Sequence, residues 1–244
     1  MTRLAAALHE PYITPYAEER VELPLTFEHV AGAERLTYRD ALPGEWMFGA
    51  LWARCGTTRG GTILWSMVHT LRQRRCMIKG LCRVCGQSAT DSETGRLWWV
   101  LSSMPPLDGV TPWPTVGPPT CRDHVTEALN ACPHLRRRNR RKLFVCTVGG
   151  CMPIGVLANL YDHDDGRIIE VRHQIAIGLD ETHLLPRALA TQLIVSLRDI
   201  QPEAIAPDSP TDRETMPTLQ AAIRNDRTDT SCDVQQEIAE GVAL

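Results

Sequence analysis

The sequence predicts an α+β fold in which short strands and two or three longer helices surround a compact module rich in cysteine and histidine. Two segments, residues 63–78 and 184–200, repeat apolar side chains at helical spacing. Two others, residues 97–101 and 143–148, are rich in the aromatic and β-branched residues that favour strands. We therefore expect strands and helices to alternate along the chain.

Strands and one helix are expected before the module. Residues 21–27 alternate apolar and polar side chains, but Pro24 restricts such a strand to the edge of a sheet. Residues 44–54 are rich in Trp, Met and Leu and fit another short strand. The helix at 63–78 ends in several cations, which suit a helix C-terminus, and Gly80 is a suitable C-cap.

The module itself begins at residue 81. A turn at Gly95 precedes the strand at 97–101, and a loop at 104–120 contains six prolines. A short helix is expected from residue 121 to residue 132, directly after this loop.

A hairpin and an amphipathic helix are expected after residue 142. Strands at 154–161 and 168–177 flank a run of turn-forming residues at 162–166. The helix at 184–200 is predicted from leucines at every fourth position, namely Leu185, Leu189, Leu193 and Leu197. The chain thus divides into four expected parts: 1–80, 81–142, 143–200 and 201–244.

Composition is that of an ordinary soluble protein. Of 244 residues, 43% are hydrophobic and 23% are charged. No stretch reaches the roughly 20 apolar residues of a membrane span. The apolar run near the N-terminus is five residues long, below the roughly 7–15 of a signal peptide. We expect a cytoplasmic protein without membrane contact, whose nine cysteines are metal ligands and buried thiols.

Charge is distributed unevenly along the chain. Residues 53–142 contain 15 Lys and Arg against 5 Asp and Glu, whereas the rest of the chain contains 11 against 24. Residues 201–244 are polar and acidic and are expected to form a mostly disordered tail. This distribution indicates that the basic middle part meets a polyanion or the protein's own acidic parts.

Four candidate metal ligands stand in two closely spaced pairs: Cys82 with Cys85, and Cys121 with His124. Two residues separate the members of each pair, and 35 residues separate the pairs. Gly86 allows a tight turn that can direct two thiolates at one cation, and positions three apart on a helical turn face the same way. Cysteine and histidine in such pairs favour tetrahedral Zn²⁺. The order of knuckle, hairpin, loop and helix resembles a treble-clef-like zinc finger.

Two residues further along the chain are alternative fourth ligands. Cys132 and His134 follow the expected helix, and either could replace His124.

Catalysis at this site is not expected. Four protein ligands close a zinc site, whereas catalytic zinc keeps one position for water. The strand at 97–101 and the two serines after it contain no His, Asp or Glu that could activate water, which argues against nuclease chemistry. The His-x-Glu motif of zinc deaminases is also missing. We expect Zn²⁺ in a structural role.

A strongly basic run follows the module directly. Six cations lie within seven residues, namely Arg136, Arg137, Arg138, Arg140, Arg141 and Lys142. Such a run is what phosphate contacts require. Five further cations could extend the same surface: Arg72, Arg74, Arg75, Lys79 and Arg83. Trp98 and Trp99 could stack on bases, although we expect one of them to belong to the hydrophobic core.

The motifs at 81–86, 118–121 and 132–135 together resemble a group of uncharacterised actinobacterial proteins. That group shares a Cys-x-x-Cys-Gly knuckle, a Trp-containing hairpin, a Pro-Pro-x-Cys-x-x-Cys motif and a Cys-Pro-His/Ala-Leu motif. The similarity covers roughly residues 44–160 and implies zinc binding without implying an activity. His124 stands where the group commonly has Cys, a change that preserves zinc chemistry.

The sequence therefore predicts a non-enzymatic, zinc-stabilised protein that binds DNA or RNA, with regulation as one role. The alternative is a zinc-stabilised protein-interaction or scaffold module without affinity for nucleic acid. Strand pairing between subunits in the 143–200 part could form a homodimer. An enzyme built on that part is a third option.

Overall fold

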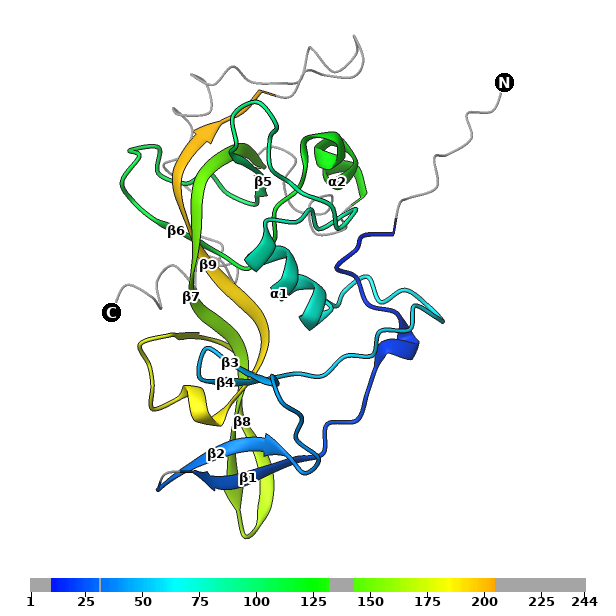
Figure 1. Cartoon of the computed structure of the whole chain (residues 1–244), viewed down its shortest axis with the longest axis vertical. Coiled ribbons are helices and arrows are strands. Elements are labelled where there is room, and N and C mark those ends of the chain that lie inside the picture. The colour runs from blue at the N-terminus through cyan, green and yellow to red at the C-terminus, as the bar shows by residue number, and fades with distance from the viewer. Residues whose placement is uncertain (1–9, 31, 132–142, 205–244) are drawn as a thin grey trace, which may run out of the picture.

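Two long antiparallel strands form the centre of the fold. The computed structural model describes residues 10–30, 32–131 and 143–204. Within them, β7 (Phe144–Asp164) pairs with β9 (Ala188–Pro202) over most of its length. Figure 1 shows the two strands running together along the long axis of the molecule. Each therefore offers one outer edge to the rest of the chain.

Shorter strands pair with these two outer edges. β5 (Leu97–Leu101) and β8 (Arg167–Gly178) pair with the two halves of β7. β4 (Ala50–Trp52) and β6 (Trp113–Thr115) pair with the two halves of β9. β3 (Trp46–Met47) adds to β4, which completes a seven-stranded sheet. Strands that are far apart in the sequence thus share one sheet.

The helix before the module is shorter than the sequence predicts. α1 (Thr70–Lys79) begins after His69, whose side chain accepts a hydrogen bond from the backbone N–H of Arg72. Gly80 is the C-cap in the left-handed conformation, with φ of 62°, so that prediction is confirmed. The prediction of a helix from residue 63 is wrong. The backbone before α1 forms hydrogen bonds with the N-terminal segment instead, as from Leu64 N–H to Pro15 C=O at 2.9 Å.

One side chain of α1 fills the gap that β4 and β6 leave along β9. β4 pairs with residues 189–190 of β9, and β6 pairs with residues 195–197. Between them, the fully buried amide of Gln73 accepts from Leu193 N–H and donates to Leu193 C=O, both at 2.9 Å. The same amide donates to Val116 C=O at 2.9 Å. Gln73 thereby pairs backbone groups that burial would otherwise leave unsatisfied.

The prediction of an amphipathic helix at 184–200 is wrong. Residues Leu185–Arg187 form a 3₁₀ turn (η3), and β9 follows directly. β9 is buried without interruption from Leu193 to Leu197, and spacing alone does not distinguish a core strand from a buried helix. Ile194 and Val195 are β-branched, and the ladder with β7 satisfies the backbone of β9.

The fold class is therefore mostly β, and the predicted α+β, treble-clef-like fold with two or three longer helices is wrong. The described residues contain nine strands. Their two α-helices have ten and seven residues: α1, and α2 (Val125–Ala131). The predicted hairpin is present, but its strands β7 and β8 are 21 and 12 residues long. No helix in this part of the chain is long and apolar enough to cross a membrane.

A separate two-stranded sheet covers one end of the molecule. β1 (Leu25–Val30) and β2 (Ala33–Tyr38) pair with each other. Their apolar side chains share a core cluster with β4 and β9 that includes Leu36 and Leu189. The Phe27 ring meets the His163 imidazole edge-on, with 5.4 Å between ring centroids. The small sheet thus lies against the β7–β8 hairpin, as Figure 1 shows.

A buried ion pair fixes the N-terminal segment to α1. The Glu19 side chain is fully buried and accepts hydrogen bonds from the Arg72 guanidinium and from Tyr16 N–H. Arg72 also donates to Thr14 C=O at 3.0 Å. His69 Nε2 lies 3.8 Å from the Glu19 carboxylate. A buried carboxylate requires partners of this kind, so residues 10–20 and α1 behave as one unit.

Three of the sequence-based predictions concern residues that lie wholly or partly outside the described ones. The expected tail at 201–244 begins with the last two residues of β9 and lies outside them from residue 205. Cys132 and His134 lie outside them as well. The same holds for the basic run, namely Arg136, Arg137, Arg138, Arg140, Arg141 and Lys142.

Replacing Gln73 with Met should lower the free energy of unfolding by roughly 2–4 kcal/mol. Methionine has similar volume but leaves Leu193 N–H and C=O without partners inside the core. Urea unfolding of the two proteins measures the difference. Gln201→Met is the matched control. Gln201 is exposed on β9, the strand that carries Leu193, so this change should alter stability little. Equal stability of Gln73→Met and the parent would contradict the proposed role of the amide.

Stability should fall with decreasing pH because of His69. Burial lowers the pKa of His69 below its ordinary value of 6.5. The unfolded chain then binds a proton at a pH where the folded chain does not, so stability is lost as the pH drops below about 6.5. His69→Asn keeps a helix N-cap and should show a smaller loss between about pH 7 and about pH 5.5.

Urea unfolding of parent and variant at both pH values measures this difference. Thr182→Asn, at an exposed residue whose side chain does not titrate, should keep the parent's dependence. A parent and His69→Asn with equal pH dependence would contradict the prediction.

Candidate metal centre

A tight turn presents the first pair of cysteines. Cys82 N–H donates to Gln87 C=O at 2.7 Å, and Gly86 N–H donates to Cys82 C=O at 2.8 Å. Gly86 has φ of 73°, which a side chain would disfavour. Val84 N–H points at Cys82 Sγ at 3.3 Å. The turn therefore places both sulfur atoms on one side and directs backbone N–H groups at them.

The second pair lies at the entrance to α2. Cys121 precedes the 3₁₀ turn Arg122–His124 (η2), and His124 N–H donates to Cys121 C=O at 3.0 Å. α2 continues directly from this turn. Positions 121 and 124 therefore lie one turn apart and face the same way, as the spacing predicts.

The structure brings the two pairs together. One ligand atom from each of Cys82, Cys85, Cys121 and His124 lies within 4.8 Å of all the others. Cys85 Sγ and Cys121 Sγ are 3.9 Å apart, and Cys121 Sγ is 3.0 Å from His124 Nδ1. Cys82 is fully buried, and the other three are half-buried. These four side chains could hold one metal ion.

The three thiols are not equivalent. Hydrogen bonding lowers the pKa of Cys82 to about 5, because the Cys121 thiol donates to it and neighbouring backbone N–H groups point at its sulfur. The same hydrogen bond raises the pKa of Cys121, and burial raises the pKa of Cys85. The fold thus prepares Cys82 as the thiolate, and a cation would favour deprotonation of the other two.

A carboxylate lies beside the histidine of the cluster. Glu127 Oε2 is 3.8 Å from His124 Nε2, on the opposite side of the ring from Nδ1. A carboxylate near Nε2 favours a proton there, which leaves the Nδ1 lone pair directed at the cysteines. The spacing of the Cys and His ligands does not point to Glu127, although its position three residues after His124 on a helix is a usable signal.

Arg83 connects the two pairs. Its guanidinium donates to Thr120 Oγ1 at 2.8 Å and to Val100 C=O at 3.0 Å. Its backbone N–H donates to Pro119 C=O at 2.8 Å. A residue between the first two cysteines thereby holds the segment that leads to Cys121. Nothing in the local sequence indicates these partners, because they lie 17 to 37 residues away.

The N-terminal segment supports the turn from the other side. Tyr12 N–H donates to Val84 C=O at 2.8 Å, and Ile13 N–H donates to Arg83 C=O at 3.2 Å. The Tyr12 ring lies against Gly86, where a Cβ would come within 2.9 Å of it. Gly86 therefore serves both the turn and this contact.

Several predicted nucleic-acid contacts are unavailable for that role. Trp98 and Trp99 are buried, and their indole N–H groups donate to Asp91 and to Gly117 C=O. Arg72 is committed to Glu19, as described above. Arg74 is half-buried over the Trp52 ring, 4.4 Å from its centroid, and burial lowers its pKa. Both tryptophans therefore lie in the core, where one of them was expected, and neither side chain is exposed for stacking on bases.

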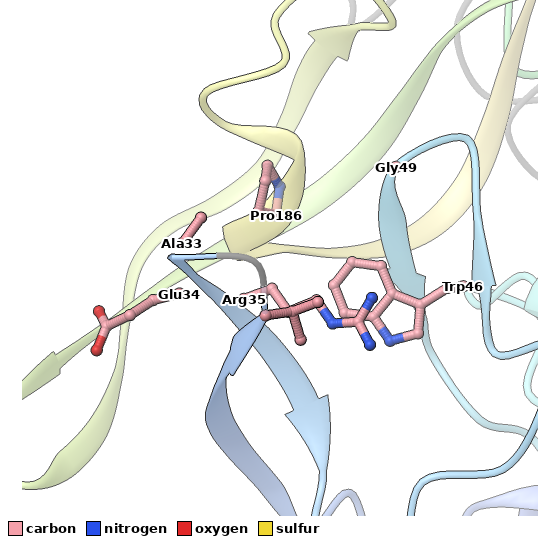
Figure 2. A pocket seen from close by; sticks show the side chains of 7 residues that line it. Ala33, Glu34, Arg35, Trp46, Gly49 and Pro186 are labelled. Carbon is pink, nitrogen blue, oxygen red and sulfur yellow. The ribbon is translucent and has the colours of Figure 1, made fainter.

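A pocket lies near β1 and β2, away from the metal cluster. It encloses about 260 Å³ and is lined by residues that include Arg35, Trp46 and Pro186. Figure 2 shows the Arg35 guanidinium reaching over Trp46, with 4.5 Å to the ring centroid. Its two charged side chains are already paired, Arg35 with Glu28 and Glu34 with Arg187. The cluster is therefore the stronger functional candidate.

No protein-family model, no curated protein and no solved structure matches this chain.

Replacing Cys121 with Ser should remove bound metal from the protein. The substitution takes away a sulfur donor that contacts all three other members of the cluster. Elemental analysis of chelator-free preparations should give about one equivalent of metal in the parent and less than about half in the variant. Cys151→Ser, a half-buried cysteine outside the cluster, is the control and should retain the metal. A parent without metal would contradict the prediction.

Proposed function

We propose that this chain binds one structural Zn²⁺ through Cys82, Cys85, Cys121 and His124, and that the metal-bound region supports nucleic-acid binding. The observation that carries the proposal is the convergence of these four donors. Zn–S bonds of about 2.3 Å in a tetrahedron place sulfur atoms about 3.8 Å apart. The distance between Cys85 Sγ and Cys121 Sγ is 3.9 Å.

Zinc suits this donor set better than other common ions. Three thiolates and an imidazole are soft and borderline ligands, whereas magnesium and calcium require oxygen. Four protein donors fill a tetrahedron and leave no position for water, so the metal has a structural role.

The metal would stabilise a region with little regular structure. Between β5 and η2 the chain contains one strand, the three-residue β6. The three cysteines of the site belong to a small apolar cluster with Val84, Ala89 and Ala128. Zinc would crosslink the turn at residue 82 to the start of α2 and contribute directly to folding here.

The nucleic-acid part of the proposal rests on the basic run at 136–142. The chain leaves α2 at Ala131 and is described again from Leu143, directly before β7. In the sequence the run is therefore flanked by α2, which continues from the turn that carries His124, and by β7. Exposed Arg122 lies between the ligands Cys121 and His124. Six cations within seven residues favour phosphate contacts.

Base-specific recognition is not expected from the described residues. Trp98 and Trp99 are buried, and Arg72 and Arg83 are held by internal hydrogen bonds. The remaining chemistry is attraction between cations and phosphate, which is independent of sequence and sensitive to salt.

Binding of short DNA and RNA should therefore weaken steeply with salt. Fluorescence anisotropy at several salt concentrations measures the slope of log K against log salt. Changing Arg136, Arg137, Arg138, Arg140, Arg141 and Lys142 to Gln should flatten that slope. Changing Arg167 and Arg172, which lie on β8 at the opposite end of the molecule from α2, to Gln is the control.

The full chain and a chain ending at residue 204 are compared, because the acidic tail could mask the basic run. Absence of binding in both at low salt would contradict the nucleic-acid proposal. With zinc still bound, that result would favour the alternative of a zinc-stabilised protein-interaction module. Purified parent protein that contains no zinc would instead contradict the proposed structural Zn²⁺ site.

A further inference from the structure

The three cysteines of the metal cluster differ in how far solvent reaches them. Cys82 is fully buried, and Val84 N–H points at its sulfur at 3.3 Å. Cys85 and Cys121 are half-buried. A buried cysteine reacts slowly, because reagents in solvent do not reach its sulfur. A small oxidant therefore reaches Cys85 and Cys121 more readily than Cys82.

The two accessible cysteines are also in contact with each other. Their Sγ atoms are 3.9 Å apart, although 35 residues separate them in the sequence. The S–S bond of a disulfide is about 2.05 Å long, so the two sulfur atoms would have to approach by about 2 Å. Rotation of the two side chains can supply this approach, because each sulfur lies on a rotatable Cα–Cβ bond.

Backbone contacts hold the two cysteines in this arrangement. Arg83, two residues before Cys85, donates from its backbone N–H to Pro119 C=O at 2.8 Å. Its guanidinium donates to Thr120 Oγ1, also at 2.8 Å. Thr120 directly precedes Cys121. The two sulfur atoms are thus kept next to each other by contacts that do not involve a metal ion.

Another cysteine near the cluster, Cys76, is not placed to compete for this bond. It is fully buried in α1, and its thiol donates to the backbone C=O of Cys82 at 3.9 Å. Burial therefore protects Cys76 from oxidation in the same way as Cys82.

We propose that Cys85 and Cys121 form a redox-sensitive pair, which peroxide converts into a disulfide that replaces the metal as the link between the turn at 82–87 and η2. The pairing itself needs only the two sulfur atoms. The exchange of metal for disulfide rests on the proposed zinc site, because the new bond takes two of its four donors. Cys82 and His124 remain, and a structural zinc site needs four protein ligands.

Hydrogen peroxide is a sufficient oxidant for this reaction. The thiolate of one cysteine attacks a peroxide oxygen, which breaks the O–O bond and gives a sulfenic acid and hydroxide. The second thiolate attacks the sulfenic sulfur, which forms the S–S bond and releases a second hydroxide. Each hydroxide takes up one of the two thiol protons. Two thiols and one peroxide thus give one disulfide and two water molecules, and the cysteines lose two electrons to the peroxide.

The disulfide would join the same two segments as the metal. Cys85 belongs to the turn that begins at Cys82, and Cys121 is the N-cap of η2. A crosslink between these segments restricts the unfolded chain, whether it is a metal ion or a disulfide. Oxidation should therefore remove the metal from the protein while the turn and η2 stay linked.

Peptide mapping of the full chain tests the pairing. Protein supplied with zinc is treated with hydrogen peroxide, its remaining thiols are alkylated, and it is digested with trypsin without reduction. Trypsin cleaves after basic residues and separates the three cysteines into peptides 80–83, 84–96 and 97–122. We expect peptide 84–96 joined to 97–122, alkylated Cys82 in peptide 80–83, and about one zinc ion released for each disulfide.

A bridge that contains Cys82 would overturn the proposal, as would Cys85 and Cys121 that stay unlinked after treatment. Zinc content before oxidation separates this result from the proposed function. A parent without zinc that still forms the bridge would contradict the zinc site alone, whereas a zinc-containing parent without the bridge would contradict the redox pair alone. Cys151→Ser, at a half-buried cysteine outside the cluster, is the control and should form the same bridge.

The stability of the oxidised protein tests whether one link replaces the other. Urea unfolding compares oxidised protein with reduced protein from which a chelator has removed zinc. The oxidised protein should unfold at a higher urea concentration, because the disulfide closes a long loop. Treatment with a dithiol and zinc should reverse both the bridge and the loss of metal. Equal unfolding midpoints would overturn the replacement of the metal by the disulfide.

Discussion

The antiparallel pairing of β7 with β9 is the constraint on which the rest of the structure depends. Every other strand of the seven-stranded sheet pairs with one of these two, apart from β3, which pairs with β4. Their outer edges hold β8 and three strands from the first half of the chain, β4, β5 and β6. Gln73 completes the edge of β9 where no strand is present. Segments without a strong intrinsic preference for helix or strand are thus held by backbone hydrogen-bond partners on β7 and β9.

The metal cluster adds a second, local constraint at one end of this sheet. Its two pairs are joined by the hydrogen bonds of Arg83 and supported by the N-terminal segment through Tyr12. That segment is in turn held to α1 by the buried pair of Glu19 and Arg72. The cluster, the N-terminus and α1 therefore form one connected unit, and a metal ion would stabilise all three.

The arginine residues show that the role of a charged side chain depends on the tertiary structure around it. From the sequence, the cations between residues 72 and 83 resemble the basic run at 136–142. In the structure, Arg72 and Arg83 are hydrogen-bonded inside the protein and Arg74 lies over Trp52. Burial gives these side chains a structural role, because a desolvated cation needs acceptors or an aromatic face.

The sequence by itself determined features that depend on near neighbours. The spacing of Cys82 with Cys85 and of Cys121 with His124 places each pair on one turn, and Gly80 ends α1 because it tolerates a left-handed conformation. Only the tertiary structure decided that residues 188–202 are a strand, since their apolar spacing fits a helix as well. It likewise decided the roles of Gln73, Arg83 and Glu19. Their partners lie far away in the sequence, and no local pattern encodes a hydrogen bond to a distant residue.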